Sequence, residues 1–369
     1  LTLGERWKQG LAGNVWRALI GMSVLGLVSR LATRKLKLDE TRKPQAGRIR
    51  LTIEGRDIDF RVSSLPLFEG EKVVLRVLDN SVKVPALADL GFSPPHIKPI
   101  EAAITKTHGL LLITGPTGSG KTSTLYTLLT MLNKEGINII TLEDPVEYYV
   151  GGVNQSQINP EVGYTFASGL RSILRQDPNI IMVGEIRDEE TAELVVHASL
   201  TGHLVLSTLH TNDAMGAVPR LLDMGAEPFL LASTVNLVMA QRLARRICPD
   251  CAAKASVAAE VVAVIERELA AIPADYLKGV AAKIPKPLVF RKGAGCSRCS
   301  NQGYRGRVAV AEVILFTETL QELTTTGFKA REVAAELAKQ HFVTLRQDCI
   351  LKAAQGFTTL EEVFRVTQS

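Results

Sequence analysis

The sequence predicts an α/β protein whose main domain is a parallel sheet covered by helices, preceded by a smaller α+β domain. Three observations predict this class. Four short apolar runs, LLLIT, INIITL, NIIMVGE and HLVLSTLH, recur between about residues 105 and 213, and helix-prone stretches separate them. Upstream, residues 48–78 alternate apolar and polar side chains at period two. Downstream, four cysteines stand in two C-x₂-C pairs, which indicates a metal-binding insertion.

The bulk composition is that of a folded protein. The chain has 369 residues, of which 46% are hydrophobic and 22% charged, and this excludes the disordered and fibrous classes. The net charge of +5 is uneven, because residues 1–50 hold eleven Lys/Arg against three Asp/Glu and the remainder is about −3. Such a basic flank either meets a phosphate or an anionic membrane, or is a solvated face.

The beginning of the chain, residues 1–38, is basic and helix-prone. Its most apolar stretch, Val15–Ala32, has only twelve residues between Arg17 and Arg30. A spanning helix needs about 20 apolar residues, so we expect a buried or amphipathic helix here. No secretory signal pattern is visible, which predicts a cytosolic protein. Because the chain starts with Leu1, we expect a fragment or a processed product.

Turn signals at Glu54-Gly55 and Glu69-Gly70 divide residues 48–78 into antiparallel strands. We therefore expect an N-terminal α+β domain over residues 1–80. The following stretch VKVPALADLGFSPPHIKPI has four prolines and predicts a linker, which we place at 81–92. The main domain then covers 93–369.

A glycine-rich stretch, GPTGSGKT, stands between the apolar run GLLLIT and the helix-prone STLYTLLTMLNK. It fits the strand–GxxxxGK[ST]–helix pattern of a nucleoside triphosphate site. Glycines let backbone N–H groups converge on an anion, and the helix N-terminus adds partial positive charge. We expect Lys121 to reach the β- and γ-phosphates and Thr122 to coordinate Mg²⁺. The expected cradle is Gly115, Pro116, Thr117, Gly118, Ser119, Gly120, Lys121, Thr122 and Ser123.

Acidic residues and histidines follow the other apolar runs. Glu185, just past NIIMV, is placed to polarise a water against the γ-phosphate. Carboxylates clustered over residues 143–147, among them Glu143 and Asp144, are suited to Mg²⁺ or its waters. In TGHLVLSTLHTNDA, His203 and His210 either sense the γ-phosphate or hold neighbouring loops.

The set GPTGSGKT, TLEDPVEY, GEIRD and TGHLVLSTLHTNDA, in that order, resembles the secretion ATPases that assemble type IV pili and type II secretion pseudopili. In that family these motifs are the Walker A, Asp-box, Walker B and His-box elements. The resemblance covers about residues 27–369. QAGRI, GRDIDFRVSSLP and GEKVVLRVL match the family's second N-terminal domain, DLGFS the start of its motor domain, and TTLEEVFRVT its closing helix.

The resemblance implies a RecA-like P-loop NTPase motor domain in a homohexameric ring. ATP and Mg²⁺ would lie between the small N-terminal domain and the motor domain, and hydrolysis would drive pilus or pseudopilus assembly through an inner-membrane platform protein. It implies a cytoplasmic location, peripheral to the inner membrane. By motif position it assigns Arg61 and Arg76 to the arginines that complete the site, and Arg171 and Arg175 to a second pair.

Two features depart from the family pattern. A DIHIEP-like strand and a following RxRxDG hairpin are not visible ahead of the matched region, where the chain reads LTLGERWKQGLAGNVWRALIG. We therefore expect a truncated or divergent N-terminal domain. The membrane-recruiting domain of many relatives is likewise not seen in this chain.

The four cysteines form Cys248-Pro-Asp-Cys251 and Cys296-Ser-Arg-Cys299, with 44 residues between the pairs. Four thiolates make a closed structural Zn²⁺ site, and we expect one within a subdomain at 245–302, with AAEVVAVIERELAAI as a helix. A C-terminal helical region would cover 303–369, with Cys349 as a small buried residue. In the family, assembly ATPases commonly carry this element and retraction ATPases lack it, which favours an extension or secretion motor.

The sequence is compatible with three other functions. One is a pilus-retraction or DNA-uptake or transfer ATPase of the same superfamily. A second is a nucleic-acid-binding zinc protein, which predicts stacking aromatics among the basic residues. Residues 1–50 hold only Trp7 and Trp16, so we expect no nucleic-acid partner. A third is an inactive scaffold, against which the intact Lys121 and Glu185 argue.

Overall fold

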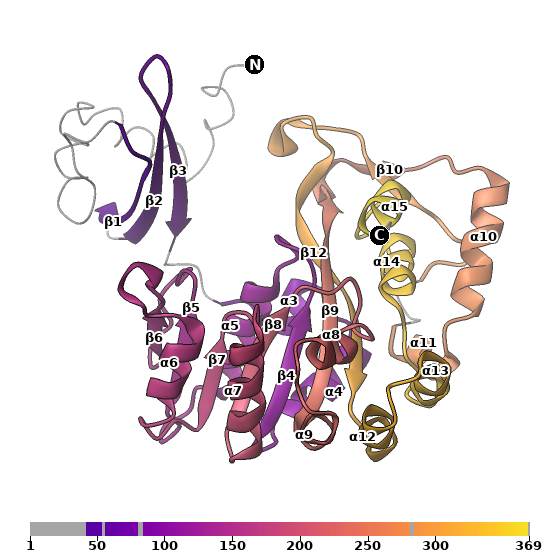
Figure 1. Ribbon diagram of the computed structural model, residues 1–369. Helices are drawn as coiled ribbons and strands as arrows, with labels where there is room; N and C mark the ends of the chain where they lie inside the picture. The colour runs from indigo at the N-terminus through magenta and orange to yellow at the C-terminus, as the bar shows by residue number, and fades with distance from the viewer. Residues whose placement is uncertain (1–41, 54–55, 80–83, 281–283, 368–369) are drawn as a thin grey trace. The chain divides into compact units, whose positions relative to one another are not determined.

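The chain folds into two compact units, which Figure 1 shows. The structure is a computed structural model that describes residues 42–53, 56–79, 84–280 and 284–367. One unit comprises the chain up to residue 83 together with 147–149, and the other comprises 84–146 and 150–369. The helix expected at 15–32 and most of the basic flank lie outside the described residues.

The first unit contains a three-stranded antiparallel sheet of β1 (Gln45–Ile53), β2 (Arg56–Pro66) and β3 (Glu71–Asp79). The antiparallel strands predicted from the period-two pattern are therefore confirmed. Ile58 and Phe60 of β2 are buried in an apolar cluster, which accounts for every second residue of this strand being hydrophobic.

The second unit is built on a seven-stranded sheet with the order β12-β9-β4-β8-β7-β5-β6. All neighbouring strands are parallel except β12, which is antiparallel to β9. The four predicted apolar runs are confirmed as β4, β5, β7 and β8. The strands are β4 (Gly109–Thr114), β5 (Ile139–Glu143), β6 (Asn154–Gln157), β7 (Ile180–Val183), β8 (Leu204–Leu209), β9 (Val235–Ile247) and β12 (Tyr304–Leu315).

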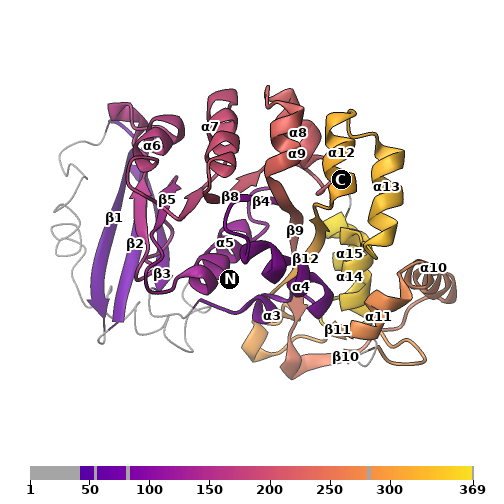
Figure 2. The ribbon, with the colours of Figure 1, turned by 90° about the horizontal axis from the view of Figure 1, so that it is seen from below.

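Helices cover both faces of this sheet. Figure 2 shows α3, α4 and α5 on one side and α7, α9 and α12 on the other. Strands β4, β5, β7 and β8 are buried along their whole length, which explains why their sequences are continuously apolar rather than alternating. The helices that cover the faces are α3 (Leu87–Leu90), α4 (Pro94–Ile104), α5 (Lys121–Leu132), α6 (Phe166–Ile173), α7 (Glu189–Leu200), α8 (Ala217–Asp223), α9 (Pro228–Thr234) and α12 (Glu318–Thr325).

Two predictions at the edges of the main domain differ from the structure. The region 303–369 was expected to be helical, but it begins with β12, whose VAVAEVIL segment pairs with β9. The proline-rich stretch 82–100 contains helices α3 and α4. Pro94 and Pro95 occupy the first turn of α4, where a missing N–H costs no helical hydrogen bond, and Ile100 is buried.

The helices that close the chain are α13 (Ala330–Lys339), α14 (Leu345–Ala354) and α15 (Leu360–Thr367). Cys349 of α14 is buried, as predicted. Among the described residues, the longest helices fall short of the length and hydropathy that crossing a bilayer requires.

Glu362 fastens α15 to the central sheet. Its carboxylate has no exposed surface and accepts hydrogen bonds from the backbone N–H and Nε of Arg245, at 2.7 and 2.8 Å, and from Nε and Nη2 of Arg365, both at 2.6 Å. Burial alone would raise the pKa of Glu362, but the hydrogen bonds from Arg365 and Arg245 outweigh it and lower the pKa to about 2.

We expect Glu362→Gln to lower the free energy of unfolding by about 3 kcal/mol at pH 7, because both arginines lose their buried carboxylate. Urea unfolding followed by circular dichroism measures this. The adjacent Glu361 is exposed and is the matched control, so Glu361→Gln should change stability by less than about 0.5 kcal/mol. Equal effects of the two substitutions would contradict the assignment.

His96 of α4 is a buried neutral imidazole. Its Nε2 lies 2.9 Å from the Tyr276 hydroxyl on α11 (Ala274–Val280), and its Nδ1 lies 3.2 Å from the Ser93 hydroxyl. Burial lowers the pKa of His96 from 6.5 to about 4, against an opposing effect of Asp348.

We expect this histidine to make stability depend on pH between 6.5 and 4. In that window the unfolded chain binds a proton that the folded protein excludes, so the free energy of unfolding should fall by about 1.4 kcal/mol per pH unit as pH decreases. Urea unfolding at several pH values should show a shallower dependence for His96→Gln. The exposed His108 provides the control, and an unchanged slope in His96→Gln would refute the prediction.

Candidate active site and metal centre

Four of the predicted nucleotide-site segments in the second unit lie where parallel strands end. In parallel sheets the carboxyl ends of neighbouring strands lie at one edge, where ligands bind. In the order β4, β8, β7 and β5, these ends lead into the glycine-rich stretch 115–122, His210, Glu185 and Asp144. The sheet order therefore places four segments that are distant in sequence side by side.

The glycine-rich stretch 115–122 joins β4 to α5: residues 115–120 form the loop, and Lys121 and Thr122 begin the helix. Gly115, Gly118 and Gly120 have φ of +145°, +80° and +92°, a conformation that residues with a Cβ rarely adopt. Gly120 is the N-cap of α5, so the loop leads directly into a helix N-terminus, the kind of position that can bind an anion. Pro116, Thr117 and Gly118 are exposed, whereas the hydroxyl of Ser119 is buried.

Lys121, the first residue of α5, folds back over this loop. Its Nζ donates to the carbonyl oxygens of Gly115 at 2.7 Å and Pro116 at 3.2 Å. Burial lowers the pKa of Lys121, the Glu185 carboxylate opposes this effect, and the Arg242 guanidinium adds to it. Thr122, the expected Mg²⁺ ligand, is exposed at the start of the helix.

A row of polar, ionisable side chains extends from His210 to Asp144. Nε2 of His210 lies 3.3 Å from one Glu185 oxygen, and the other oxygen pairs with Arg187. Arg187 also reaches Asp144, at 3.5 Å. The hydrogen bond with Glu185 raises the pKa of Arg187. Sequence reasoning missed Arg187, although it stands in the quoted GEIRD motif two residues after Glu185.

Glu143, the last residue of β5, is buried beneath this row. Its carboxylate accepts hydrogen bonds from Thr141 at 2.6 Å, from Gln155 at 3.0 Å and from the Tyr126 hydroxyl. Because Tyr126 belongs to α5, this carboxylate joins the helix that follows the glycine-rich loop to the neighbouring strands. Glu147 is part of the first unit and lies 2.8 Å from Arg61.

The structure does not bring His203 to the glycine-rich loop. His203 precedes β8, so it lies at the opposite edge of the sheet, where its Nδ1 is 2.9 Å from the Ala198 carbonyl at the end of α7. This contact joins His203 to the last turn of helix α7. On the α6 side, Arg171 pairs with Glu190 of α7 at 2.5 Å, and Arg175 donates to the Arg171 carbonyl at 2.7 Å.

Arg61 and Arg76 lie directly opposite each other on β2 and β3 of the first unit. Residues paired in this way project from the same face of a sheet. Because side chains alternate along a strand, this is the face opposite the apolar cluster of Ile58 and Phe60. Arg61 is half-buried and Arg76 is exposed.

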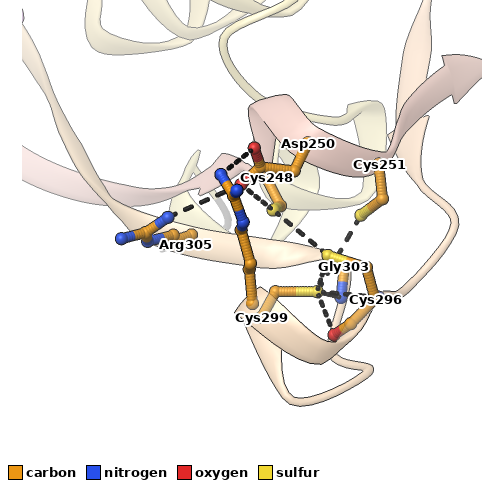
Figure 3. Close-up of polar contacts among 8 residues, drawn as sticks. Cys248, Asp250, Cys251, Cys296, Cys299, Gly303 and Arg305 are labelled. Carbon is orange, nitrogen blue, oxygen red and sulfur yellow. Dashed lines mark hydrogen bonds and ion pairs between the residues drawn. The ribbon is translucent and has the colours of Figure 1, made fainter. Parts of the chain in front are cut away.

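The four predicted cysteines come together into one cluster, which Figure 3 shows. Their sulfur atoms all lie within 4.8 Å of one another, and the separations are 3.9 Å for Cys248–Cys296, 3.8 Å for Cys251–Cys299 and 3.7 Å for Cys296–Cys299. Four sulfurs around an ion with bonds of about 2.3 Å are separated by about 3.8 Å, so the cluster fits a tetrahedral metal.

Contacts around the cluster hold the two cysteine pairs in place. The sulfur of Cys299 accepts backbone N–H groups of Cys296 at 3.2 Å and of Gly303 at 3.3 Å (Figure 3). Asp250, between the first two cysteines, pairs with Arg298 of the second pair at 2.9 Å. The insertion between the pairs includes β10 (Ala252–Lys254), α10 (Ala259–Ala270) and β11 (Arg291–Gly293), and α10 confirms the predicted helix.

A family model described as "Type II/IV secretion system protein" matches residues 18–365. The chain therefore belongs to this family. It is 48% identical over 343 residues to "Type II secretion system protein E" of Pseudomonas aeruginosa, covering 93% of this chain and 65% of that protein. It is 49% identical over 329 residues to "Type IV pilus assembly ATPase PilB" of Myxococcus xanthus, covering 89% and 56%. The chain thus spans less than two thirds of the length of these relatives.

Solved structures share the fold. The pilus retraction motor PilT with bound ADP matches with a TM-score of 0.64 and 25% identity, over 91% of this chain and 82% of that one. The ATPase DotB of Legionella pneumophila matches in fold with a TM-score of 0.61 and 21% identity, over 95% and 82%. The family model and the two curated relatives confirm the predicted family, and the solved structures show the same fold.

Proposed function

We propose that this protein is a Mg²⁺-dependent ATPase whose RecA-like P-loop domain drives assembly of type IV pili or type II secretion pseudopili. The observation that carries the proposal is the alignment of the glycine-rich loop with His210, Glu185 and Asp144 on four adjacent strand ends. This arrangement supplies an anion cradle and a water-activating carboxylate at the same edge of the sheet.

Each residue has a distinct role in the proposed reaction. The loop amides and Lys121 hold the triphosphate, and Lys121 is oriented by the Gly115 and Pro116 carbonyls. Glu185 orients and polarises the water that attacks the γ-phosphate in line. His210 and Arg187 fix the direction of the Glu185 carboxylate, because each contacts one of its oxygens.

Magnesium has ligand candidates in the Thr122 hydroxyl and the Asp144 carboxylate, both oxygen donors of the kind it prefers. When bound, it would neutralise charge on the β- and γ-phosphates. Glu143 contributes by its buried hydrogen bonds, which hold α5 and with it Lys121 and Thr122.

The assembly follows from the family resemblance. A homohexamer would place Arg61 and Arg76 where they complete the nucleotide site, with Arg171 and Arg175 as further cations. The paired positions of Arg61 and Arg76 on one face support a joint role. We infer a cytoplasmic protein, peripheral to the inner membrane, that acts on a platform protein. The names of the relatives, a type II secretion protein E and an assembly ATPase, support this role.

The cysteine cluster would hold a structural Zn²⁺. Its sulfur separations and two N–H···S hydrogen bonds at Cys299 fit a closed thiolate site without an open coordination position. Since β10 and β11 pair between the two cysteine pairs, the ion would lock the insertion onto β9 and β12. The cluster favours an assembly or secretion motor over a retraction motor.

We expect Glu185→Gln to lower ATP turnover at least about a hundredfold, because an amide cannot accept the water proton. Binding of a fluorescent ATP analogue should remain. Lys121→Ala should abolish both binding and turnover. The exposed Glu193 of α7 is the matched control, so Glu193→Gln should keep wild-type turnover. Undiminished phosphate release by Glu185→Gln would refute the role of Glu185.

We expect the purified protein to contain about one Zn²⁺ per chain, measured by mass spectrometry of the metal. Cys299→Ser should lose the ion and the thermal stability of the insertion, because three thiolates bind zinc more weakly than four. Cys349→Ser, at a buried cysteine outside the cluster, should retain the full metal content. Equal zinc content in the two variants would contradict the site.

A further inference from the structure

Arg242 stands on β9 beside the start of the glycine-rich loop. The pairing of β9 with β4 ends at Ala240 and Thr114, so the next residues of β9 flank Gly115. A Cβ at Gly115 would collide with the Gln241 carbonyl oxygen and would lie 3.2 Å from Nη1 of Arg242. The loop therefore begins beside the Arg242 guanidinium, and the nearby Gln241 carbonyl oxygen, together with the positive φ, explains the need for glycine at position 115.

The other end of the same guanidinium reaches a second loop. Nη2 of Arg242 donates to the carbonyl oxygen of Asn212, at 2.9 Å, in the loop 210–214 that follows β8. These two loops are also joined by Thr114 and Thr211, since the Thr211 N–H donates to the Thr114 hydroxyl at 2.8 Å. Arg242 thus spans the loops that leave β4 and β8, which are adjacent in the sheet.

The loop 210–214 is fixed at its far end by Glu312 of β12. This buried carboxylate accepts the N–H of Ala214 at 2.7 Å and the N–H of Leu345, the first residue of α14, at 2.9 Å. Burial lowers the pKa of Arg242, while the carboxylates of Glu312 and Asp213 oppose this effect. Since an arginine side chain stays protonated in proteins, Arg242 is a cation beside the loop 210–214.

Nη1 of Arg242 is buried and has no hydrogen-bond partner among the residues that the structure describes. An unpaired buried donor is costly, and natural proteins keep few of them. Because this atom faces the buried start of the loop, and Pro116 to Gly118 form its exposed part, Arg242 lies behind the cradle. Arg242 would therefore affect a bound triphosphate indirectly, by fixing the position of the glycine-rich loop.

We propose that Arg242 is a positioning residue, which fixes the loop 210–214 relative to the glycine-rich loop. In this way Arg242 would keep the His210 imidazole in contact with the Glu185 carboxylate when the triphosphate is bound. The inference rests on the proposed ATPase function and extends it to a residue outside the four motifs. A planar guanidinium suits this task because one amino group can hold the Asn212 carbonyl while the other lies beside the start of the glycine-rich loop.

The test compares Arg242→Ala, Arg242→Lys and the control Arg246→Ala in the full chain. Arg246 is exposed on the same strand, where it lies over the Phe357 ring at 5.5 Å, so its substitution should leave turnover unchanged. We expect Arg242→Ala to lower kcat about tenfold, the scale of coupling within one network, with an unfolding midpoint close to that of Arg246→Ala. Arg242→Lys should recover little, because one ammonium group cannot span both loops.

A double-mutant cycle with His210→Ala separates positioning from general damage. If Arg242 acts through the loop of His210, then Arg242→Ala should cost less than about twofold in kcat once His210 is absent. Fully additive losses, or wild-type kcat in Arg242→Ala, would overturn the proposal. A loss confined to nucleotide affinity, with kcat intact, would also overturn it and indicate a direct phosphate contact.

Hydrogen–deuterium exchange of the nucleotide-free protein provides a measurement that does not depend on turnover. In Arg242→Ala, amides of residues 115–120 and 211–214 should exchange faster, while Arg246→Ala should leave both segments unchanged. Unchanged exchange in Arg242→Ala would reject the inference even in an inactive protein. An inactive wild-type chain with the expected exchange pattern would instead reject the ATPase proposal alone.

Discussion

The site depends on the order of strands in the central sheet. Strands β4, β8, β7 and β5 are adjacent and parallel, so the loops that follow them emerge at one edge and in a fixed sequence. Without β7 between β8 and β5, the Glu185 carboxylate would be separated from His210 or from Asp144. Parallel strands require crossover helices, and these helices bury both faces of the sheet, which holds the loop positions rigidly.

Buried polar groups then fix what the strand order brings together. Glu143 joins α5 to its neighbouring strands, Glu312 joins the loop after β8 to α14, and Glu362 joins α15 to β9. Each carboxylate is hydrogen-bonded on both oxygens, since burying a charge without partners would be very unfavourable. In all three cases a buried, hydrogen-bonded carboxylate connects a strand, or the loop that follows a strand, to a helix.

In the insertion between the two cysteine pairs, the cysteine cluster would have the same stabilising role that buried carboxylates have in the main sheet. Residues 252–295 contribute two short strands and the helices α10 and α11, with few buried side chains, of which Ile265 in α10 is one. A small unit with such a limited core gains stability from a metal cross-link. The two cysteine pairs flank this insertion, so one ion would restrain both of its ends.

Much of the fold and part of the site could be predicted from residue types. The buried strands β4, β5, β7 and β8 were predictable because continuous apolar runs bounded by turn residues have few alternatives. β9 and β12 were not predicted, because their mixed sequences, VNLVMAQRLARRI and YRGRVAVAEVIL, become strands through pairing with each other and with β4. The helix α4 was obscured by its prolines, of which Pro94 and Pro95 are harmless in the first turn while Pro99 lies inside the helix.

By itself the sequence determined the glycine-rich loop, the placement of Glu185 after a buried strand and the two cysteine pairs, because these are local patterns whose chemistry depends on residue type and spacing. Only the tertiary structure decided which residues meet. The tertiary structure brings the side chains of His210 and Arg187 into contact with the Glu185 carboxylate. It also places His203 at the opposite edge of the sheet and Arg242 beside the buried start of the glycine-rich loop. The physical reason is that contacts between strand ends follow the lateral order of the sheet, which nothing in the linear order of the residues specifies.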